Sequence, residues 1–520
     1  MTGAALSLSA GAAAAAAAWL IPRRVAGARM AVPPSILLDL MPVVLTAGLL
    51  LIISARPLFS GAVVLALGGG FAFADRTKRR VLREPVVFSD MSEFGHLFTQ
   101  PHLYLPFAGP ALVIGGALAA IGTALGLLAF TTPLWQPAPA PILIVLLIAH
   151  IAGWLLSREP LLSLTAIWLR RLRPIGDPVV DAARLGPFCV LLVYGIIARA
   201  ERAGRRTPFH PLPAPMLRDR RAAMPVVLVQ CESFFDARRI SPSMPKDLLP
   251  GFEACLWRGA TFGRLETAAW GANTMRTEFA VLTGIAEERL GYDRFNPYHA
   301  FARAPIASLA SQLRAEGYRT LCLHPFERRF FRRDLTMRAL GFDAFLGRET
   351  LGGSRRPPYR SDPDLARQVL TILDAEGPRT FIFVITMGNH GPWPENEGQI
   401  DPELHRLFGL GDFPQGGALL HYLTGLTHSD EMLGILLEEL GARRDNAVLG
   451  FYGDHLPSLP DAFEHLGFDD WASDYILVDG TVSRPRRLDL AAHMLPRLIL
   501  DRLRIRNLLG RSSRAPVLTR

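Results

Sequence analysis

Five apolar runs in the first 157 residues constrain the fold of this chain more than any other feature. Each is close to the length of about 20 residues that an α-helix needs to cross a bilayer. They are ALSLSAGAAAAAAAWLI (5–21), SILLDLMPVVLTAGLLLIIS (35–54), PLFSGAVVLALGGGFAFA (57–74), YLPFAGPALVIGGALAAIGTALGLLAF (104–130) and PILIVLLIAHIAGWLLS (141–157). Residues 1–199 are therefore predicted to form a multi-pass membrane domain.

Arginine-rich segments predict the orientation of this domain. They follow the first, third and fifth runs, at residues 23–29, 76–83 and 158–173. The positive-inside rule places such segments in the cytoplasm, and no basic residue precedes the first run, so an uncleaved span with an outer N-terminus is favoured over a signal peptide. A shorter stretch at 184–199 could be a buried or interfacial helix, but we favour a sixth crossing, which would bring the rest of the chain outside.

The overall charge and the cysteines exclude two other classes of protein. The net charge of +9 comes from arginines that flank apolar spans and are not interleaved with aromatic residues, so no nucleic-acid partner is predicted. Cys189, Cys231, Cys255 and Cys322 show no paired spacing. No disulfide framework or cysteine metal site is therefore inferred.

The second half of the chain alternates short β-branched runs with helical segments. The runs are PVVLVQ, TLCLH, TFIFVITM, NAVLGFYG and DYILVDG, and segments such as APIASLASQLRAEGY between them have helical periodicity. This alternation predicts an α/β domain with a mostly parallel central sheet over residues 223–520. Residues 200–222 are rich in proline and arginine and are predicted to be a linker at the membrane surface.

Polar side chains follow four of the predicted strands. In open α/β sheets the ligand binds beyond the carboxyl ends of the strands, and carboxylates with imidazoles form a ligand set for a divalent cation. A metal site is therefore predicted among the residues at these ends, which are Glu232, His324, His390, Asp454 and His455.

Thr274 lies in GANTMRTEFAVLTG, where a turn of small residues delivers a hydroxyl to the start of a predicted helix. Close to a divalent cation, a threonine hydroxyl becomes acidic enough to attack phosphorus or sulfur. The alternative is a helix-capping threonine with no chemical role.

Over nearly all of residues 225–460, the segments VVLVQCESF, GANTMRTEFAVLTG, LCLHPF, FFRRDLTMRALGFDAF, ITMGNHGPW and GFYGDH resemble, in order, the motifs of the lipoteichoic acid synthase family. Members of that family are membrane-anchored phosphoglycerol transferases of the alkaline phosphatase and sulfatase superfamily. The resemblance implies a sulfatase-like catalytic domain that follows a multi-span α-helical membrane domain in a bacterial cell membrane and faces the periplasm or the outside. It also implies transfer of phosphoglycerol from phosphatidylglycerol to a glycan or polymer hydroxyl through a covalent phospho-threonine.

The same resemblance implies roles for individual residues. The ion would be Mn²⁺ or Mg²⁺, with Zn²⁺ as the alternative, and Thr274 would be both a metal ligand and the nucleophile. The other ligands would be Glu232, Asp454 and His455, and the substrate would be bound by His390, Arg333, His324 and Phe331. The family commonly has Trp at the position of Phe331 and Asn at that of Arg332, so recognition of the head group is the least transferable part.

Three other functions compete with this one. A phosphoethanolamine transferase would share the threonine, but the cysteines that often flank that family's nucleophile are absent here. A sulfatase would need a Cys or Ser in C-x-P-x-R, which the chain lacks. A non-catalytic membrane protein that binds glycans or lipids would have no need of Glu232, Thr274, Asp454 and His455 together.

Overall fold

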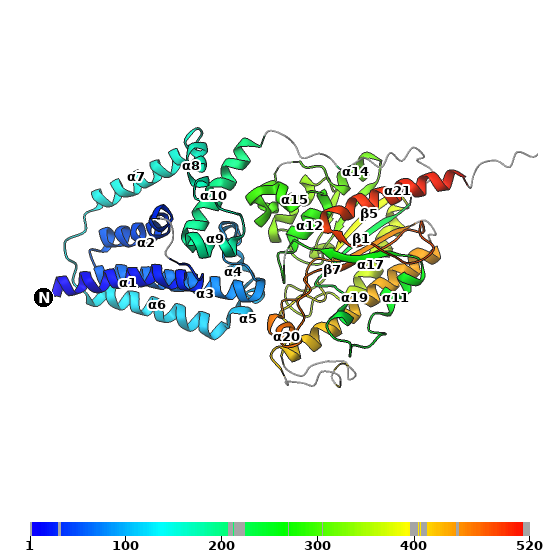
Figure 1. The fold of residues 1–520 in the computed structure, drawn as a ribbon, viewed down its shortest axis with the longest axis horizontal. Coiled ribbons are helices and arrows are strands. Elements are labelled where there is room, and N and C mark those ends of the chain that lie inside the picture. Colours follow the sequence, from blue (N-terminus) through cyan, green and yellow to red (C-terminus); the bar gives the residue numbers. More distant parts are fainter. Residues whose placement is uncertain are drawn as a thin grey trace, which may run out of the picture. The chain divides into compact units, whose positions relative to one another are not determined.

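The computed structural model describes residues 3–29, 33–205, 212, 224–268, 270–303, 305–395, 404, 406, 413–443 and 447–512. The chain divides into two compact units, Met1–Arg206 and Thr207–Arg520. The first unit is helical and the second is an α/β domain (Figure 1).

The membrane unit contains five helices that are long and apolar enough to cross a bilayer. α1 and α3 pack so closely that a Cβ on Gly61 would lie 2.5 Å from the carbonyl oxygen of Gly11, as is usual where small residues line a helix interface in membranes. The five helices are α1 (Gly3–Val25), α2 (Pro33–Ser54), α3 (Pro57–Leu82), α6 (Pro110–Phe130) and α7 (Pro139–Leu156). The shorter helices of this unit are η1 (Phe88–Ser92), α4 (His96–Thr99), η2 (Pro101–Leu103), α5 (Leu105–Ala108), α8 (Leu161–Arg170), α9 (Pro178–Leu185) and α10 (Pro187–Gly204).

The two ends of the helical bundle differ in charge. At one end, the turn between α2 and α3 meets the segment after α6, where the Leu134 N–H donates to the Ala55 carbonyl (2.8 Å) and Arg56 Nε donates to the Thr131 carbonyl (2.9 Å). The basic segments that follow α1, α3 and α7 lie at the opposite end, which we call the basic end.

α10 begins and ends near the basic end. In its first turn, the Cys189 N–H donates to Asp39 Oδ1 (3.0 Å), and the Asp39 carboxylate pairs with Arg23 (2.7 Å). In its last turns, Glu201 pairs with Arg170 (2.7 Å). Because Arg23 and Arg170 both belong to the basic end, α10 does not run to the other end of the bundle.

The predicted stretch at 184–199 is a packed helix, α10, which is not among the five described helices that are long and apolar enough to cross a bilayer. Its apolar side chains are buried against neighbouring helices, with Tyr194 and Val193 fully buried, which explains why its sequence looks like a short span. Because the five long helices alternate in direction, the first begins at one end of the bundle and the last finishes at the other. Of the predicted linker, residues 200–204 continue α10, while 206–211 and 213–223 lie outside the described residues.

The α/β unit is built on a nine-stranded sheet in the order β4-β3-β5-β1-β6-β7-β2-β8, with β9 also paired to β2. The five strands from β4 to β6 are parallel, and among the described strands only the pairings of β7 with β6 and with β2 are antiparallel. This confirms the predicted mostly parallel sheet. The strands are β1 (Val226–Cys231), β2 (Thr261–Glu266), β3 (Arg319–Leu323), β4 (Ala344–Leu346), β5 (Thr380–Ile385), β6 (Val448–Gly453), β7 (Ser473–Val478), β8 (Arg486–Arg487) and β9 (Leu490–Ala491).

Helices cover both faces of the sheet (Figure 1), so the central strands are buried on both sides. Along β1, Val227 and Val229 point into one apolar core and Val226 and Leu228 into the other, as the two-residue period of a strand requires. The first core is closed by α11 (Pro250–Trp257), α17 (Asp362–Glu376) and α19 (Gly416–Arg443), and the second by α12 (Thr274–Thr283), α14 (Leu309–Ala315) and α21 (Leu495–Ser512).

Candidate metal and nucleophile site

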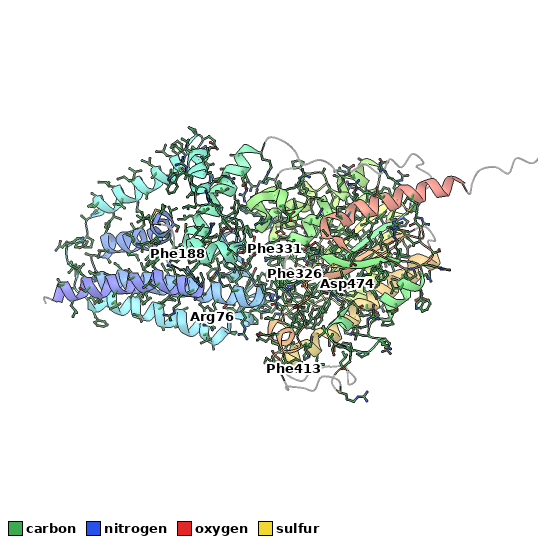
Figure 2. The ribbon with its side chains drawn as sticks, in the orientation of Figure 1. Arg76, Phe188, Phe326, Phe331, Phe413 and Asp474 are labelled. Atoms are coloured by element: carbon green, nitrogen blue, oxygen red, sulfur yellow. The ribbon has the colours of Figure 1, made fainter. Side chains whose placement is uncertain are left out.

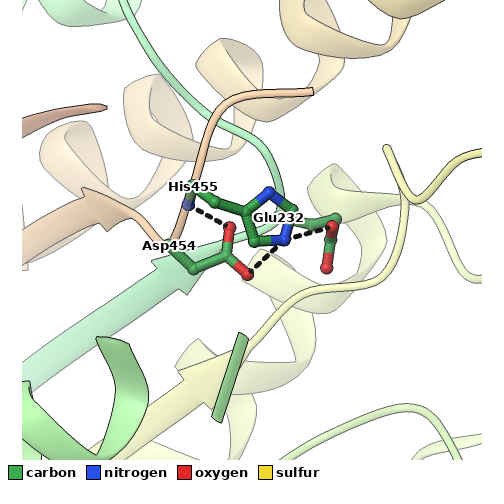
Figure 3. A group of neighbouring side chains, drawn as sticks. All are labelled: Glu232, Asp454 and His455. Carbon is green, nitrogen blue, oxygen red and sulfur yellow. Dashed lines mark hydrogen bonds and ion pairs between the residues drawn. The ribbon is translucent and has the colours of Figure 1, made fainter. Parts of the chain in front are cut away.

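Two neighbouring parallel strands bring three metal-binding side chains together. Glu232 follows β1, and Asp454 and His455 follow β6. His455 Nε2 lies 3.4 Å from Glu232 Oε1 and 3.3 Å from Asp454 Oδ2 (Figure 3). All three residues are buried, and one ligand atom from each lies within 4.8 Å of the others. The carboxyl ends of adjacent parallel strands meet at one edge of a sheet, which is why residues more than 200 positions apart form this cluster.

The hydrogen bonds around the cluster leave lone pairs directed at its centre. His455 Nδ1 lies 2.9 Å from the Leu456 carbonyl and must carry a hydrogen to donate to it, so Nε2 of the neutral ring has only a lone pair. Asp454 Oδ1 accepts the N–H groups of Ser233 and His455, whereas the buried Oδ2 accepts no hydrogen bond. Asp454 Oδ2 and His455 Nε2 are thus two hydrogen-bond acceptors side by side with no donor between them. Burying two such atoms together is unfavourable unless a cation lies between them. The residues present therefore fit a divalent metal ion.

The pKa of Glu232 points to the same need for positive charge. Burial and the neighbouring Asp454 carboxylate raise this pKa to about 8, although His455 and the Ser233 hydroxyl act in the opposite direction. A buried carboxyl group whose pKa is raised beside a second carboxylate is typical of a site completed by a cation.

Thr274 is the first residue of α12, and its hydroxyl faces the cluster rather than the helix backbone. Its Oγ1 lies 3.4 Å from His455 Nε2, and the residue is buried. The N-cap position belongs to Asn273, whose φ of 63° is left-handed. The structure therefore does not support the capping alternative for Thr274. The N-terminus of α12 also directs backbone N–H groups and the positive end of the helix dipole toward this position, which favours an anionic substrate.

Arg333 and His324 form a second group of polar residues. His324 follows β3, and its Nδ1 donates to the Ile385 carbonyl (3.1 Å), so its Nε2 can accept from Arg333 Nη1 (3.2 Å). Burial, and next the charge of Arg333, hold the pKa of His324 well below its usual value. His324 is therefore neutral, and the positive charge of the pair belongs to Arg333.

His390 connects the two groups electrostatically. Burial lowers its pKa, opposed by the hydrogen bond with the Gly391 carbonyl and by the charge of Asp454, while the charge of Arg333 lowers it further. It is partly buried, and its ring lies 6.0 Å from that of Tyr359. The ring of the half-buried Phe331 lies 5.5 Å from the guanidinium carbon of Arg333.

An aromatic wall borders this second group. Phe331 contacts Phe330 (4.2 Å between ring centroids), and Phe330 contacts Phe326 (5.5 Å); Phe326 and Phe331 are marked in Figure 2. Phe331 and Arg332 have positive φ angles of 53° and 56°, which non-glycine residues rarely adopt and which are frequent at binding sites. The sequence indicates neither this conformation nor the presence of Tyr359 next to His390.

Sequence reasoning also missed Glu278. It lies one helical turn after Thr274, is fully buried, and forms a two-pronged ion pair with Arg333, at 2.8 Å to Nη2 and 3.2 Å to Nε. A glutamate four residues after the candidate nucleophile, directly before the apolar run FAVL, was the available signal.

Comparisons with known proteins identify relatives of this chain. Residues 225–486 match the family model described as Sulfatase. The chain is 29% identical over 449 residues to the capsular polysaccharide biosynthesis protein RkpI of Rhizobium meliloti (strain 1021), covering 82% of this chain and 78% of that protein.

Two solved structures are also similar. The integral membrane protein lipooligosaccharide phosphoethanolamine transferase A (EptA) from Neisseria meningitidis has a TM-score of 0.54 at 13% identity, covering 96% of this chain and 94% of that one. The lipoteichoic acid synthase LtaP from Listeria monocytogenes has a TM-score of 0.43 at 19% identity, covering 54% of this chain and 72% of that one. The likeness to EptA concerns the fold, and it includes the membrane unit.

Proposed function

Since this chain belongs to the sulfatase family, we propose that it is a membrane phosphotransferase that moves phosphoglycerol from phosphatidylglycerol to a glycan hydroxyl outside the membrane. The observation that carries this proposal is the position of the Thr274 hydroxyl, 3.4 Å from His455 Nε2 in a cluster with two buried carboxylates. A hydroxyl in that place is suited to nucleophilic attack on phosphorus.

The proposed reaction has two displacements at phosphorus. Thr274 Oγ1 loses its proton and bonds to phosphorus, the bond from phosphorus to the diacylglycerol oxygen breaks, and diacylglycerol leaves after taking up a proton. The acceptor hydroxyl then loses its proton and attacks the same phosphorus, and the threonine oxygen leaves and regains a proton. Phosphoryl transfer depends mainly on positioning and on stabilising charge, which His390 and Arg333 would do for the phosphoryl oxygens.

Glu232, Asp454, His455 and Thr274 would hold a divalent metal ion. Such an ion lowers the pKa of a hydroxyl that it contacts and offsets the charge of phosphoryl oxygens. The ligand atoms would be three oxygens and one imidazole nitrogen, which suit Mn²⁺ or Mg²⁺, and Zn²⁺ accepts the same types of ligand.

The surroundings of Arg333 favour a glycerol head group over ethanolamine. Glu278 is the carboxylate that Arg333 contacts, and both of its oxygens already accept hydrogen bonds. His324 is neutral and accepts from Arg333. A cationic ammonium would meet the charge of Arg333 without a free carboxylate partner, whereas the neutral hydroxyls of glycerol can accept hydrogen bonds from it.

The acceptor is proposed to be a glycan. The similar R. meliloti protein is named for capsular polysaccharide biosynthesis and covers 82% of this chain, and a polysaccharide presents the hydroxyls that the second displacement needs.

The donor can be tested with the purified full-length protein. Incubation with Mn²⁺ and vesicles that contain either phosphatidylglycerol or phosphatidylethanolamine, each labelled in its acyl chains, should yield labelled diacylglycerol from phosphatidylglycerol. Release from phosphatidylethanolamine instead would establish an ethanolamine transferase. Release from neither, by a protein that retains its metal, would contradict both donors.

We also expect the catalytic unit to face the outside, because the proposed polysaccharide acceptor is a cell-surface polymer. With five crossings this requires the N-terminus to be cytoplasmic, the reverse of the orientation that the arginine segments indicate. Alkaline phosphatase fused after Arg206 should be active, and green fluorescent protein fused at the N-terminus should fluoresce. The opposite pair of results would place the catalytic unit in the cytoplasm.

A further inference from the structure

A buried network of hydrogen bonds joins the helix that carries Thr274 to the strands that carry the cluster. Glu278 is at its centre and accepts from Gln230 Nε2 (2.9 Å) and from the Tyr298 hydroxyl. The Oε1 of Gln230 accepts from the Tyr452 hydroxyl (2.5 Å). Gln230 is part of β1, two residues before Glu232, and Tyr452 is part of β6, two residues before Asp454. The network thus spans both strands whose ends form the cluster.

The position of Arg333 follows from this network. Its Nε and Nη2 donate to the two oxygens of Glu278, and its Nη1 donates to His324 Nε2. A fork of two parallel hydrogen bonds fixes the plane of a guanidinium as well as its place. One N–H on Nη1 and one on Nη2 are not used by these three hydrogen bonds.

A purely structural role for Glu278 is the competing explanation. Glu278 and Arg333 are almost completely buried, at 0% and 3% exposed, and a buried charge without its partner destabilises a protein strongly. Loss of function after removing Glu278 alone would therefore not distinguish a positioning role from a folding role. The contact between Gln230 and Glu278 offers a way to separate the two.

We infer that Glu278 is a positioning residue, which orients Arg333 so that its remaining N–H groups bind the phosphoglycerol group of the donor. The inference rests on the proposed function in taking a phosphoglycerol as the ligand of Arg333. Placed one turn after Thr274, Glu278 also fixes the distance between the attacking oxygen and the arginine that holds the substrate.

The test exchanges the two side chains that touch. In the double variant Glu278→Gln with Gln230→Glu, the network keeps one carboxylate and one amide, and hence its total charge and its hydrogen-bonding capacity. Arg333 then faces an amide, which offers a single acceptor oxygen, and the fork is lost. We expect Glu278→Gln alone to lower both Tm and the affinity for sn-glycerol-1-phosphate. The exchange should restore most of the Tm while the affinity stays roughly 10- to 100-fold below that of the wild type, as for other partners that orient a ligand-binding side chain.

Affinity is measured by isothermal titration of sn-glycerol-1-phosphate into the full-length, Mn²⁺-loaded proteins in detergent, with metal content checked for each. Arg333→Ala is the matched control and should lose affinity in the same range. An exchange variant that binds like the wild type would show that Glu278 is only structural. Undiminished binding by Arg333→Ala, or no binding by the wild type, would also overturn the inference. The donor assay tests the proposed function separately. If the wild-type protein releases no diacylglycerol from phosphatidylglycerol, the proposed donor is wrong.

Discussion

Replacement of Thr274 by alanine is expected to abolish release of diacylglycerol while the protein is still inserted and folded. Loss of a covalent nucleophile removes a step that no neighbouring group can replace, so turnover should fall by roughly a thousandfold or more. Stability should change little. Asn273, not Thr274, is the N-cap of α12, and even a lost cap costs only about 0.5–2 kcal/mol.

Thr274→Ser is the control, because it retains the hydroxyl and removes only a methyl group. It should keep part of the activity. Wild-type protein mixed with phosphatidylglycerol and quenched with acid should show a phosphoglycerol adduct on the peptide that contains Thr274, and Thr274→Ala should show none. Full turnover by Thr274→Ala would disprove the proposed mechanism.

Removal of a carboxylate from the cluster should remove the metal. In Asp454→Ala, the buried Oδ2 that accepts no hydrogen bond is lost together with Oδ1, and metal affinity should fall by roughly a hundredfold or more. A metal that binds only the folded state raises Tm, so a chelator should lower the Tm of the wild type and leave that of Asp454→Ala unchanged. Metal content is measured by inductively coupled plasma mass spectrometry.

Asp430→Ala provides the matched control, because Asp430 is equally buried but serves the backbone. Its carboxylate accepts the N–H groups of Gly251 (2.6 Å) and Phe252 (2.7 Å) at the start of α11. This variant should lose stability by about 1 kcal/mol and keep its metal. Full metal occupancy in Asp454→Ala would show that the ligand set is wrong.

The sheet was predictable from the alternation of short apolar runs with helical segments. The cluster was predictable from the polar residues that directly follow those runs. Parallel strands align their carboxyl ends, so Glu232 and Asp454 could be placed together without knowing the helices between them. Strand β2, which reads TFGRLE, was missed because it alternates in burial and carries charged residues. The fold of the α/β domain and its likeness to the sulfatase superfamily are confirmed.

The sequence could not show which side chains contact one another in the folded protein. The apolar character of α10 indicates a membrane span as readily as a packed helix, and the sequence does not reveal its contacts with Asp39 and Arg170. Glu278 similarly reads as an ordinary helical glutamate. Its role emerges when the fold brings Arg333, 55 residues further along the chain, within 2.8 Å.

The residues of the site come from two separate parts of the fold, the helix α12 and the central sheet. Thr274 and Glu278 are carried by one short helix, so any shift of that helix displaces the attacking oxygen and the anchor of Arg333 as a single rigid body. The metal-binding cluster follows strands of the sheet instead, so a shift of α12 does not move Glu232, Asp454 and His455 with it. The contact from Gln230 Nε2 to Glu278 (2.9 Å) is a hydrogen bond that joins this helix directly to the sheet.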